Sequence, residues 1–428
     1  MKTRLFNLLE KLRASYWLLP GMLVVMSYAL ALFVLWMDEQ VFGQKMVSVL
    51  GFEYDSISGV QTLLSVIATS SMAAASVAFS ITIVALTLAS QQFGPRLLRN
   101  FMRDNTNQVV LGGLLGIYIY CLVVLAASSD HGDVPTLSVI VAMLLAITGV
   151  FLLVFFIHNV ADGIHVNNLI AKVAEELNLT ALRLYDNDAS DEAGSDSAVD
   201  DSTLDLADIQ IASSGYLQAI NKDDLLALAV RQDAVIVLQC AAGDFLVSDA
   251  VLARISPAWR ADDDQLVQAI NAACLQGKVR TPEQDIQFLF DELLEVALRA
   301  LSPGVNDPFT ARDCIDRIAD ALVLVLKRRV RNRWLLDEDH KPRLYVRYSE
   351  PTSLMDKCFL PLITNGYNQD IVAIRIAEVC CLLSAHADEQ ESARLAHYMS
   401  ELNKKTAEDP RCSVFAQQIK QLSEKLQA

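Results

Sequence analysis

The sequence predicts an α-helical membrane domain with four transmembrane helices, followed by a cytoplasmic domain of mixed α/β and helical structure. Three observations lead to this fold class. The chain has 428 residues, of which 53% are hydrophobic, and the long apolar runs end near residue 160. The region before that point contains four long apolar segments. The remainder is rich in Asp, Glu, Lys and Arg and carries strand-like runs followed by helical periodicity.

Four segments contain the roughly 20 apolar residues that a helix needs to cross a bilayer. No Asp, Glu, Lys or Arg lies inside any of them. Pumps and charge-coupled transporters keep such groups at mid-membrane because their chemistry requires them, so this pattern argues against a coupled transporter. The second segment is long enough to tilt or to project beyond the membrane. The segments are Tyr16–Met37, Ser58–Ser90, Val109–Ala127 and Thr136–His158.

The charges that flank these segments predict their orientation. Lys and Arg precede the first segment, and Arg96, Arg99 and Arg103 lie between the second and the third. The loops Asp38–Asp55 and Ser128–Pro135 are mostly acidic. By the positive-inside rule, both termini lie in the cytoplasm. We therefore predict a multi-pass protein of the bacterial cytoplasmic (inner) membrane, with its first apolar segment retained as an anchor.

The chain divides into five predicted regions. Asp186–Asp205 is acidic and poor in large apolar residues, which predicts a disordered linker. We expect strands at Ala234–Gln239 and Phe245–Ser248 and a helix that starts at Asn221, whereas the signals from Asp262 onward are nearly all helical. The regions are a cytoplasmic N-terminus (1–15), the transmembrane domain (16–160), a helix with the acidic linker (161–207), a small α/β module (208–260) and a mainly helical cytoplasmic domain (261–428).

Composition argues against several functional classes. The net charge is -16, and an acidic surface repels phosphate, so nucleic acid is not an expected partner. The eight cysteines form no C-x-x-C pair, which argues against a zinc knuckle or a disulfide framework. Nucleophile-elbow, metalloprotease, Walker and dinucleotide motifs are all absent from the sequence. We therefore predict neither an enzyme nor a cofactor.

Three residues are a weak metal candidate. His158, Asp162 and His165 are spaced by four and then three residues, so they share one face of a helix that leaves the membrane. Two imidazoles and a carboxylate suit a divalent metal. Polar groups also gather at a membrane interface because they are costly deeper in the bilayer. We favour this second interpretation and predict no metal site.

The second apolar segment is unusually rich in hydroxyl groups. At about 100° per residue, Ser65, Thr69, Ser76, Ser80 and Thr87 fall within one stripe along the helix. We expect an aligned stripe to face something other than lipid, and not to consist of side chains that bond their own backbone. One interpretation is close packing of helices, in which small and hydroxyl residues let backbones approach. The other is a water-filled path in an oligomer.

The most distinctive soluble motif is a tight loop between two amphipathic helices. Thr281 and Pro282 predict the start of the helix Pro282–Leu301, and Asp307 is expected to cap the helix Pro308–Arg329. Pro303 fixes a backbone dihedral and Gly304 permits a positive φ. The loop is either a structural connection or a ligand or interface loop. The motif residues are Ser302, Pro303, Gly304, Asn306, Asp307 and Pro308.

The first of these two helices also carries several carboxylates. Asp285, Asp291, Glu292 and Glu295 lie along it without a recognisable nucleophile or base beside them. We interpret them as the solvent-facing side of an amphipathic helix.

Three stretches resemble a known family. SPGVNDPFTA, SITIVALTLASQQFGPRLLRNFMRD and FFIHNVADGIHVNNLI look like sequences of the bacterial integral membrane family catalogued as domain of unknown function 2254. The likeness runs from about Leu18 to the 390s and includes the order of the three stretches. It implies a multi-pass inner-membrane protein with a cytoplasmic domain, and it implies no activity and no catalytic residues.

The sequence thus predicts an oligomeric, channel-like membrane protein gated by its cytoplasmic domain. Its expected partners are the lipid bilayer, further copies of itself and ions. The alternative is a membrane-tethered scaffold or sensor without transport activity, in which the hydroxyl stripe serves packing alone.

Overall fold

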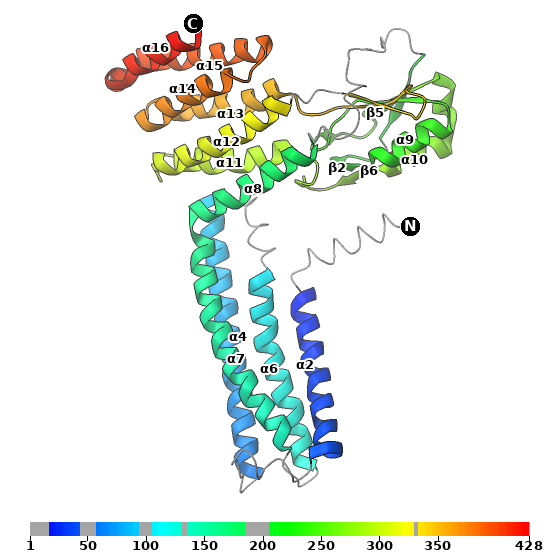
Figure 1. Ribbon diagram of the computed structural model, residues 1–428, viewed down its shortest axis with the longest axis vertical. Helices are drawn as coiled ribbons and strands as arrows, with labels where there is room; N and C mark the ends of the chain where they lie inside the picture. Colours follow the sequence, from blue (N-terminus) through cyan, green and yellow to red (C-terminus); the bar gives the residue numbers. More distant parts are fainter. Residues whose placement is uncertain are drawn as a thin grey trace. The chain divides into compact units, whose positions relative to one another are not determined.

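The computed structural model describes residues 17–42, 57–93, 105–130, 135–184, 205–211, 213–328 and 333–427. These residues form two compact units, one up to Asn168 and the other from Leu169 onward. Figure 1 shows the elements of both units. The predicted N-terminal region, the acidic linker and the basic residues Arg96, Arg99 and Arg103 lie outside the described residues.

The first unit consists of long apolar helices. They are α2 (Leu18–Met37), which continues into the π-helical turn Asp38–Phe42, α4 (Ile57–Phe93), α6 (Asn105–Asp130) and α7 (Thr136–Ile164). All four are long and apolar enough to cross a membrane, over Leu18–Gln40, Ile57–Leu88, Thr106–Ser128 and Thr136–Gly163. The prediction of four spans is confirmed, and α4 is the longest of them, as expected.

Helix α6 is the centre of this bundle, because α2, α4 and α7 all pack against it. Its contact with α2 depends on two glycines at a spacing of four. A Cβ atom on Gly112 would lie 2.7 Å from the Cα of Pro20, and one on Gly116 would overlap the hydroxyl of Ser27. In a membrane, where helices gain little from the hydrophobic effect, such small residues allow the backbones to approach closely.

One end of the bundle is joined by a shared polar cluster. The Oδ1 of Asp38 accepts a hydrogen bond from the backbone N–H of Leu137 (2.9 Å), and its Oδ2 accepts from the backbone N–H (2.9 Å) and hydroxyl (2.6 Å) of Ser138. The buried hydroxyl of Tyr120 donates to the carbonyl of Ser138 at 3.1 Å. Asp38 thus caps the first turn of α7 from a different helix, since Pro135 at the cap position has no side chain that can do so.

The Gly112 contact generates a stability prediction. We expect Gly112→Leu to destabilise the bundle by about 1–3 kcal/mol, because the added side chain has no room against Pro20. Thermal unfolding of the purified protein in detergent measures the effect. Gly21→Leu is the matched control, since a Cβ at Gly21 meets nothing within 4 Å. Equal melting temperatures for the two variants would contradict the proposed packing.

The second unit begins with α8 (Val166–Leu184), whose residues are split between the two units at Asn168. Two small sheets follow. One has the strand order β1-β5-β3-β8-β7 and the other the order β4-β2-β6. The strands are β1 (Ala207–Gln210), β2 (Gly215–Ile220), β3 (Val235–Leu238), β4 (Phe245–Leu246), β5 (Val251–Ser256), β6 (Cys274–Gly277), β7 (Arg333–Leu336) and β8 (Pro342–Val346).

Two helices complete what we call the β module, which comprises these two sheets with α9 (Lys222–Arg231) and α10 (Asp264–Ala273). Strands β3 and β4 and helix α9 confirm the predicted elements, and Asn221 caps α9 by accepting from the N–H of Asp224. The expectation of nearly uniform helix from Asp262 onward was wrong at β6, β7 and β8. Strands β6 and β8 are bonded by distant partners: β6 pairs with β2, and β8 pairs in parallel with β3, with Ile236 opposite Leu344. Strand β7 then pairs with β8, the next strand in the chain.

The rest of the unit is a stack of helices, which we call the helix stack. One layer contains α11 (Ile286–Ala300), α13 (Pro351–Gly366) and α15 (Glu389–Glu408), and the other contains α12 (Pro308–Arg328), α14 (Asp370–Ser384) and α16 (Ser413–Gln427). Each helix packs on its neighbour in both layers, as in helical-repeat proteins (Figure 1). Helix α11 is enclosed, with every residue buried or half-buried.

Candidate functional site

The five predicted stripe residues share one face of α4. Ser65, Thr69, Ser76, Ser80 and Thr87 are all exposed in the first unit, and we call this surface the hydroxyl face. The side of α4 that packs on the bundle includes Leu64, Ala75, Ala78 and Ala85. At about 100° per residue these two faces lie on opposite sides of the helix. The hydroxyl face therefore points away from the chain's own bundle.

The hydroxyl groups on this face bond their own helix. Thr69 donates to the carbonyl of Ser65, Ser76 to that of Met72, Ser80 to that of Ser76, and Thr87 to that of Ile83, at 2.8–3.0 Å. The expectation that aligned hydroxyls would not bond their own backbone was therefore wrong. Such bonds to the fourth preceding residue use the hydroxyl proton and leave the oxygen lone pairs pointing outward. These four hydroxyls are therefore aligned along the helix, and each already donates its proton to the backbone.

The other exposed faces of the bundle are different in kind. Between Thr136 and Ile157 the exposed side chains on α7 are large and apolar apart from Thr148, those on α2 are mostly so, and both faces suit lipid. Thr148 is an exposed hydroxyl residue on α7, and it also donates to a backbone carbonyl, that of Leu144. Among the described helices of the bundle, α4 alone presents a repeated run of hydroxyls to the outside. The exposed side chains on α7 include Leu144, Ile147, Val150, Phe151, Val154, Phe155 and Ile157.

The weak metal candidates do not come together as a group of three. His158 Nε2 lies 3.4 Å from Asp162 Oδ2, with both side chains exposed. His165 separates α7 from α8, and its N–H donates to the carbonyl of Asp162. Within the described ranges, no cluster of three His, Cys, Asp or Glu side chains suits a metal ion. The interface interpretation of these residues remains our prediction.

The loop between α11 and α12 is held by its own backbone and side chains. The N–H of Asp307 donates to the carbonyl of Ala300 at 2.8 Å, and the N–H of Asn306 donates to that of Ser302 at 2.9 Å. Asp307 accepts from the N–H (3.1 Å) and hydroxyl (2.6 Å) of Thr310 and so caps α12, as predicted. Pro303, Gly304 and the nearby side chains of Val305 and Phe309 are exposed.

The left-handed residue of this loop is Asn306, with φ 50°, whereas Gly304 was the expected position. Asparagine tolerates this conformation better than other residues with a Cβ atom. Its side-chain oxygen accepts from Gln369 Nε2 at 3.0 Å, which joins the loop to the connection before α14. Gly304 has open space around it and an ordinary φ. The loop is thus a rigid joint within the helix stack.

We expect Asn306→Val to destabilise the protein by about 1–2 kcal/mol, because a β-branched residue is strained at positive φ. The variant also loses the bond from Gln369. Chemical unfolding monitored by circular dichroism measures the change. Gly304→Ala should be nearly neutral. A larger effect at Gly304 than at Asn306 would show that the loop is held in another way.

The carboxylates of α11 do not form a solvent-facing side, so that interpretation was wrong. The side chains of Asp285 and Glu292 are 1% and 0% exposed. The helix begins at Ile286 with Asp285 as its cap, and not at Pro282 after Thr281. Helical spacing alone does not distinguish a solvent-exposed carboxylate from a buried one that has a partner. Whether these carboxylates face solvent depends on what packs against the helix.

Sequence reasoning also missed the cluster that Asp285 belongs to. Arg280 donates to both oxygens of Asp285, at 2.7 and 2.9 Å, and to Asp291 at 2.7 Å. Lys357 of α13 lies 2.9 Å from Asp291 and donates to Gln287 at 3.1 Å. Burial raises the pKa of the Asp285 carboxyl, and the bonds from Arg280 act in the opposite direction. The one feature of the sequence that could have indicated this cluster is Arg280, which lies a few residues before α11.

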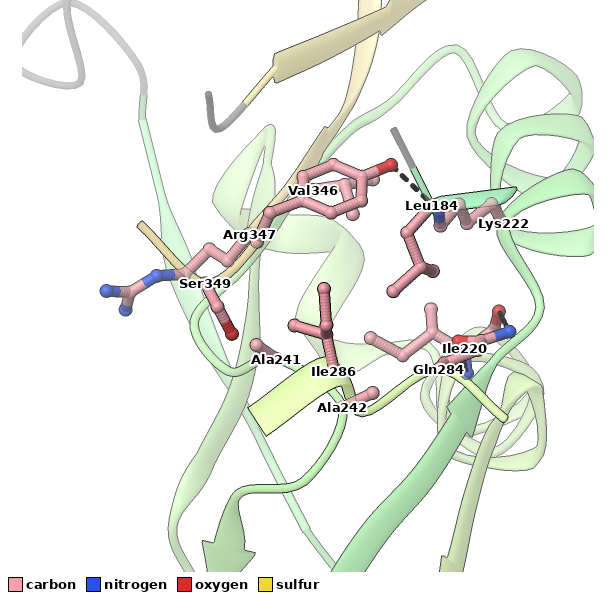
Figure 2. A pocket seen from close by; sticks show the side chains of 11 residues that line it. Leu184, Ile220, Lys222, Ala241, Ala242, Gln284, Ile286, Val346, Arg347 and Ser349 are labelled. Atoms are coloured by element: carbon pink, nitrogen blue, oxygen red, sulfur yellow. Dashed lines mark hydrogen bonds between the residues drawn. The ribbon is translucent and has the colours of Figure 1, made fainter. Parts of the chain in front are cut away.

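A small cavity lies next to this cluster, where α8, the β module and α11 meet (Figure 2). Leu184, Ile220 and Ile286 point into it, whereas the guanidinium of Arg347 points away. Lys222 at its rim is bonded to the hydroxyl of Tyr348 at 2.7 Å. The cavity measures about 20 Å³, which is room for about one water molecule.

The two cysteines of the β module, Cys240 and Cys274, are not reactive thiols. All eight cysteines of the chain are free, and seven are buried. Burial raises the pKa of Cys240 and that of Cys274 to about 12. Both thiols are therefore protonated at neutral pH and are poor nucleophiles.

Comparison with known proteins supports the membrane assignment. Residues 13–381 match the model of a family described as predicted membrane protein (DUF2254). An uncharacterized protein of Mycobacterium tuberculosis strain H37Rv, Rv1290c, and one of Mycobacterium bovis, Mb1321c, are 30% identical over 251 residues. The match covers 57% of this chain and 48% of each relative, so the chain spans about half the length of these curated relatives. No solved structure matches the chain.

Proposed function

Because the chain belongs to the DUF2254 family of predicted membrane proteins, we propose that it is a multi-pass inner-membrane protein that works as a homo-oligomer. The observation that carries the proposal is the hydroxyl face of α4, which lies opposite the chain's own bundle. A polar face is a poor match for lipid, and a second copy that presents the same face offers it a partner. The apolar outer faces of α2 and α7 are left for lipid.

In this assembly the α4 helices of neighbouring copies line a water-containing path, and the second unit acts as a cytoplasmic gate. The hydroxyls of Thr69, Ser76, Ser80 and Thr87 each donate to a backbone carbonyl of α4, so they offer oxygen lone pairs to the path. Lone pairs attract cations and the hydrogens of water, and they do not stabilise anions. The proposed permeant species is therefore a cation.

A membrane-tethered scaffold or sensor without transport is the second candidate. The same hydrogen bonds favour it, because a hydroxyl whose proton is already bonded can pack against a neighbouring helix without water. The hydroxyl face would then hold the oligomer together and conduct nothing. Neither candidate function involves catalysis, a cofactor or nucleic acid.

The proposed orientation gives a direct test. We expect both termini to lie in the cytoplasm, because the predicted basic segments are on that side. Green fluorescent protein fused after the C-terminus should fluoresce, and alkaline phosphatase fused at the same point should be inactive. Fusions in the acidic loop before Thr136 should behave in the opposite way. Active phosphatase at the C-terminus would reverse the proposed topology.

The path itself is tested by electrical recording on purified protein in liposomes. We expect the wild type to carry cation current, and Ser76→Leu and Ser80→Leu to reduce it by narrowing and drying the path. Thr148→Leu is the matched control, since it removes an exposed hydroxyl with the same backbone bond from α7. This control should leave the current unchanged.

Assembly is measured on the same samples by mass photometry. Reduced current with an intact oligomer supports the channel. No current in any variant, together with loss of the oligomer in the two α4 variants, supports the scaffold or sensor. Equal effects of the α4 and α7 substitutions on current and assembly would contradict both candidates.

A further inference from the structure

The second unit contains two parts with separate cores. The β module has its own cluster of buried residues, which includes Leu217, Ile236 and Ile255. The helix stack has the enclosed α11 at one end, next to α12 and α13. The two parts nevertheless form one compact unit. Their junction therefore decides whether they move together or separately.

Polar contacts lie at this junction, some within the segment that joins β6 to α11 and some from that segment to β2. Arg280, which follows β6, reaches the cap and the second turn of α11 through Asp285 and Asp291. Gln284 pairs with both backbone groups of Ile220 in β2, at 2.9 and 3.2 Å. The guanidinium of Arg280 has a side-chain exposure of 16%, so its bonds are largely shielded from solvent.

A glycine brings a third segment to the same carboxylate. Gly243, in the loop between β3 and β4, has φ 99° and lies so close to Asp285 that any Cβ atom there would overlap the carboxyl group. The N–H of Gly243 donates to the carbonyl of Leu217 at 2.7 Å, which holds this loop on β2. Asp285 thus lies between a loop of the β module and the arginine that neutralises it.

We propose that Arg280 is a positional lock that makes the β module and the helix stack one rigid body. An apolar contact at this point would let the two surfaces slide over one another. A largely shielded guanidinium that bonds two carboxylates fixes the distance and angle between the segment after β6 and the start of α11. Moving Arg280 away would leave the buried carboxylate of Asp285 uncompensated. A displacement at the β3–β4 loop is then passed directly to α11 and, through Lys357 on Asp291, to α13. The lock holds whether or not the protein conducts ions.

Distance measurement between spin labels on the full-length protein tests the lock. Labels at Asp249→Cys in the β module and Val414→Cys in α16 occupy exposed positions. We expect one narrow distance distribution for the otherwise wild-type chain and a broad one for Arg280→Gln. Arg254→Gln is the matched control, because it removes an exposed arginine that pairs with Asp208 inside the β module. It should keep the distribution narrow, and a narrow distribution in Arg280→Gln would overturn the proposal.

Hydrogen exchange separates a released lock from general destabilisation. In Arg280→Gln we expect amide exchange in the segment 241–244 and the first turn of α11 to rise about tenfold or more, with α14–α16 unchanged. A uniform rise over the whole unit would show that Arg280 merely adds stability and would overturn the proposal. If Arg280→Gln fails to fold, Gly243→Ala tests the same junction by displacing the loop from Asp285. It should also broaden the distance distribution, and a narrow one would contradict the lock.

Discussion

The interior of a bilayer offers no water for hydrogen bonding, so the chain itself must satisfy each polar group placed there. Several polar residues of the first unit meet this constraint. Hydroxyls of α4 donate hydrogen bonds to the backbone carbonyls one turn earlier, and the buried hydroxyl of Tyr120 donates to the carbonyl of Ser138. Asp38 meets the amides that begin α7. The constraint therefore explains how a helix so rich in serine and threonine remains a membrane helix.

Elements that are defined by their own residues were predictable from the sequence. Apolar length marks a membrane span without reference to the rest of the chain, and Asn221 and Asp307 cap helices through neighbours three residues away. Strands β6, β7 and β8 lacked such a signal because each is short. Strands β6 and β8 are stabilised by partners far away in the chain, and β7 pairs with β8, the next strand. The π-helical turn after α2 likewise depends on distant contacts, since Asp38 is engaged by α7.

The candidate sites divide in the same way. Spacing places Ser65, Thr69, Ser76, Ser80 and Thr87 on one face, because helical geometry alone fixes that relation. Spacing does not reveal that this face points away from the bundle, which depends on how α6 packs. For the carboxylates of α11 the helical pattern was misleading, because Arg280 and α13 enclose them. Whether a charged side chain is buried depends on which residues lie around it in space. The sequence of a single helix does not give those neighbours.

The two candidate functions differ in one physical quantity, the amount of water along α4 between copies. With its proton bonded to the backbone, a serine or threonine oxygen still has lone pairs that accept hydrogen bonds. A dry contact between copies leaves those lone pairs unused and gains close packing instead. A wet contact satisfies them with water or cations and forgoes the packing. Bulky apolar residues flank the hydroxyl face, among them Val66, Val77, Phe79 and Val84. These apolar residues can exclude water from the sides of the contact, whether the contact is dry or wet. The packing of the hydroxyl face then determines whether the centre of the contact contains water.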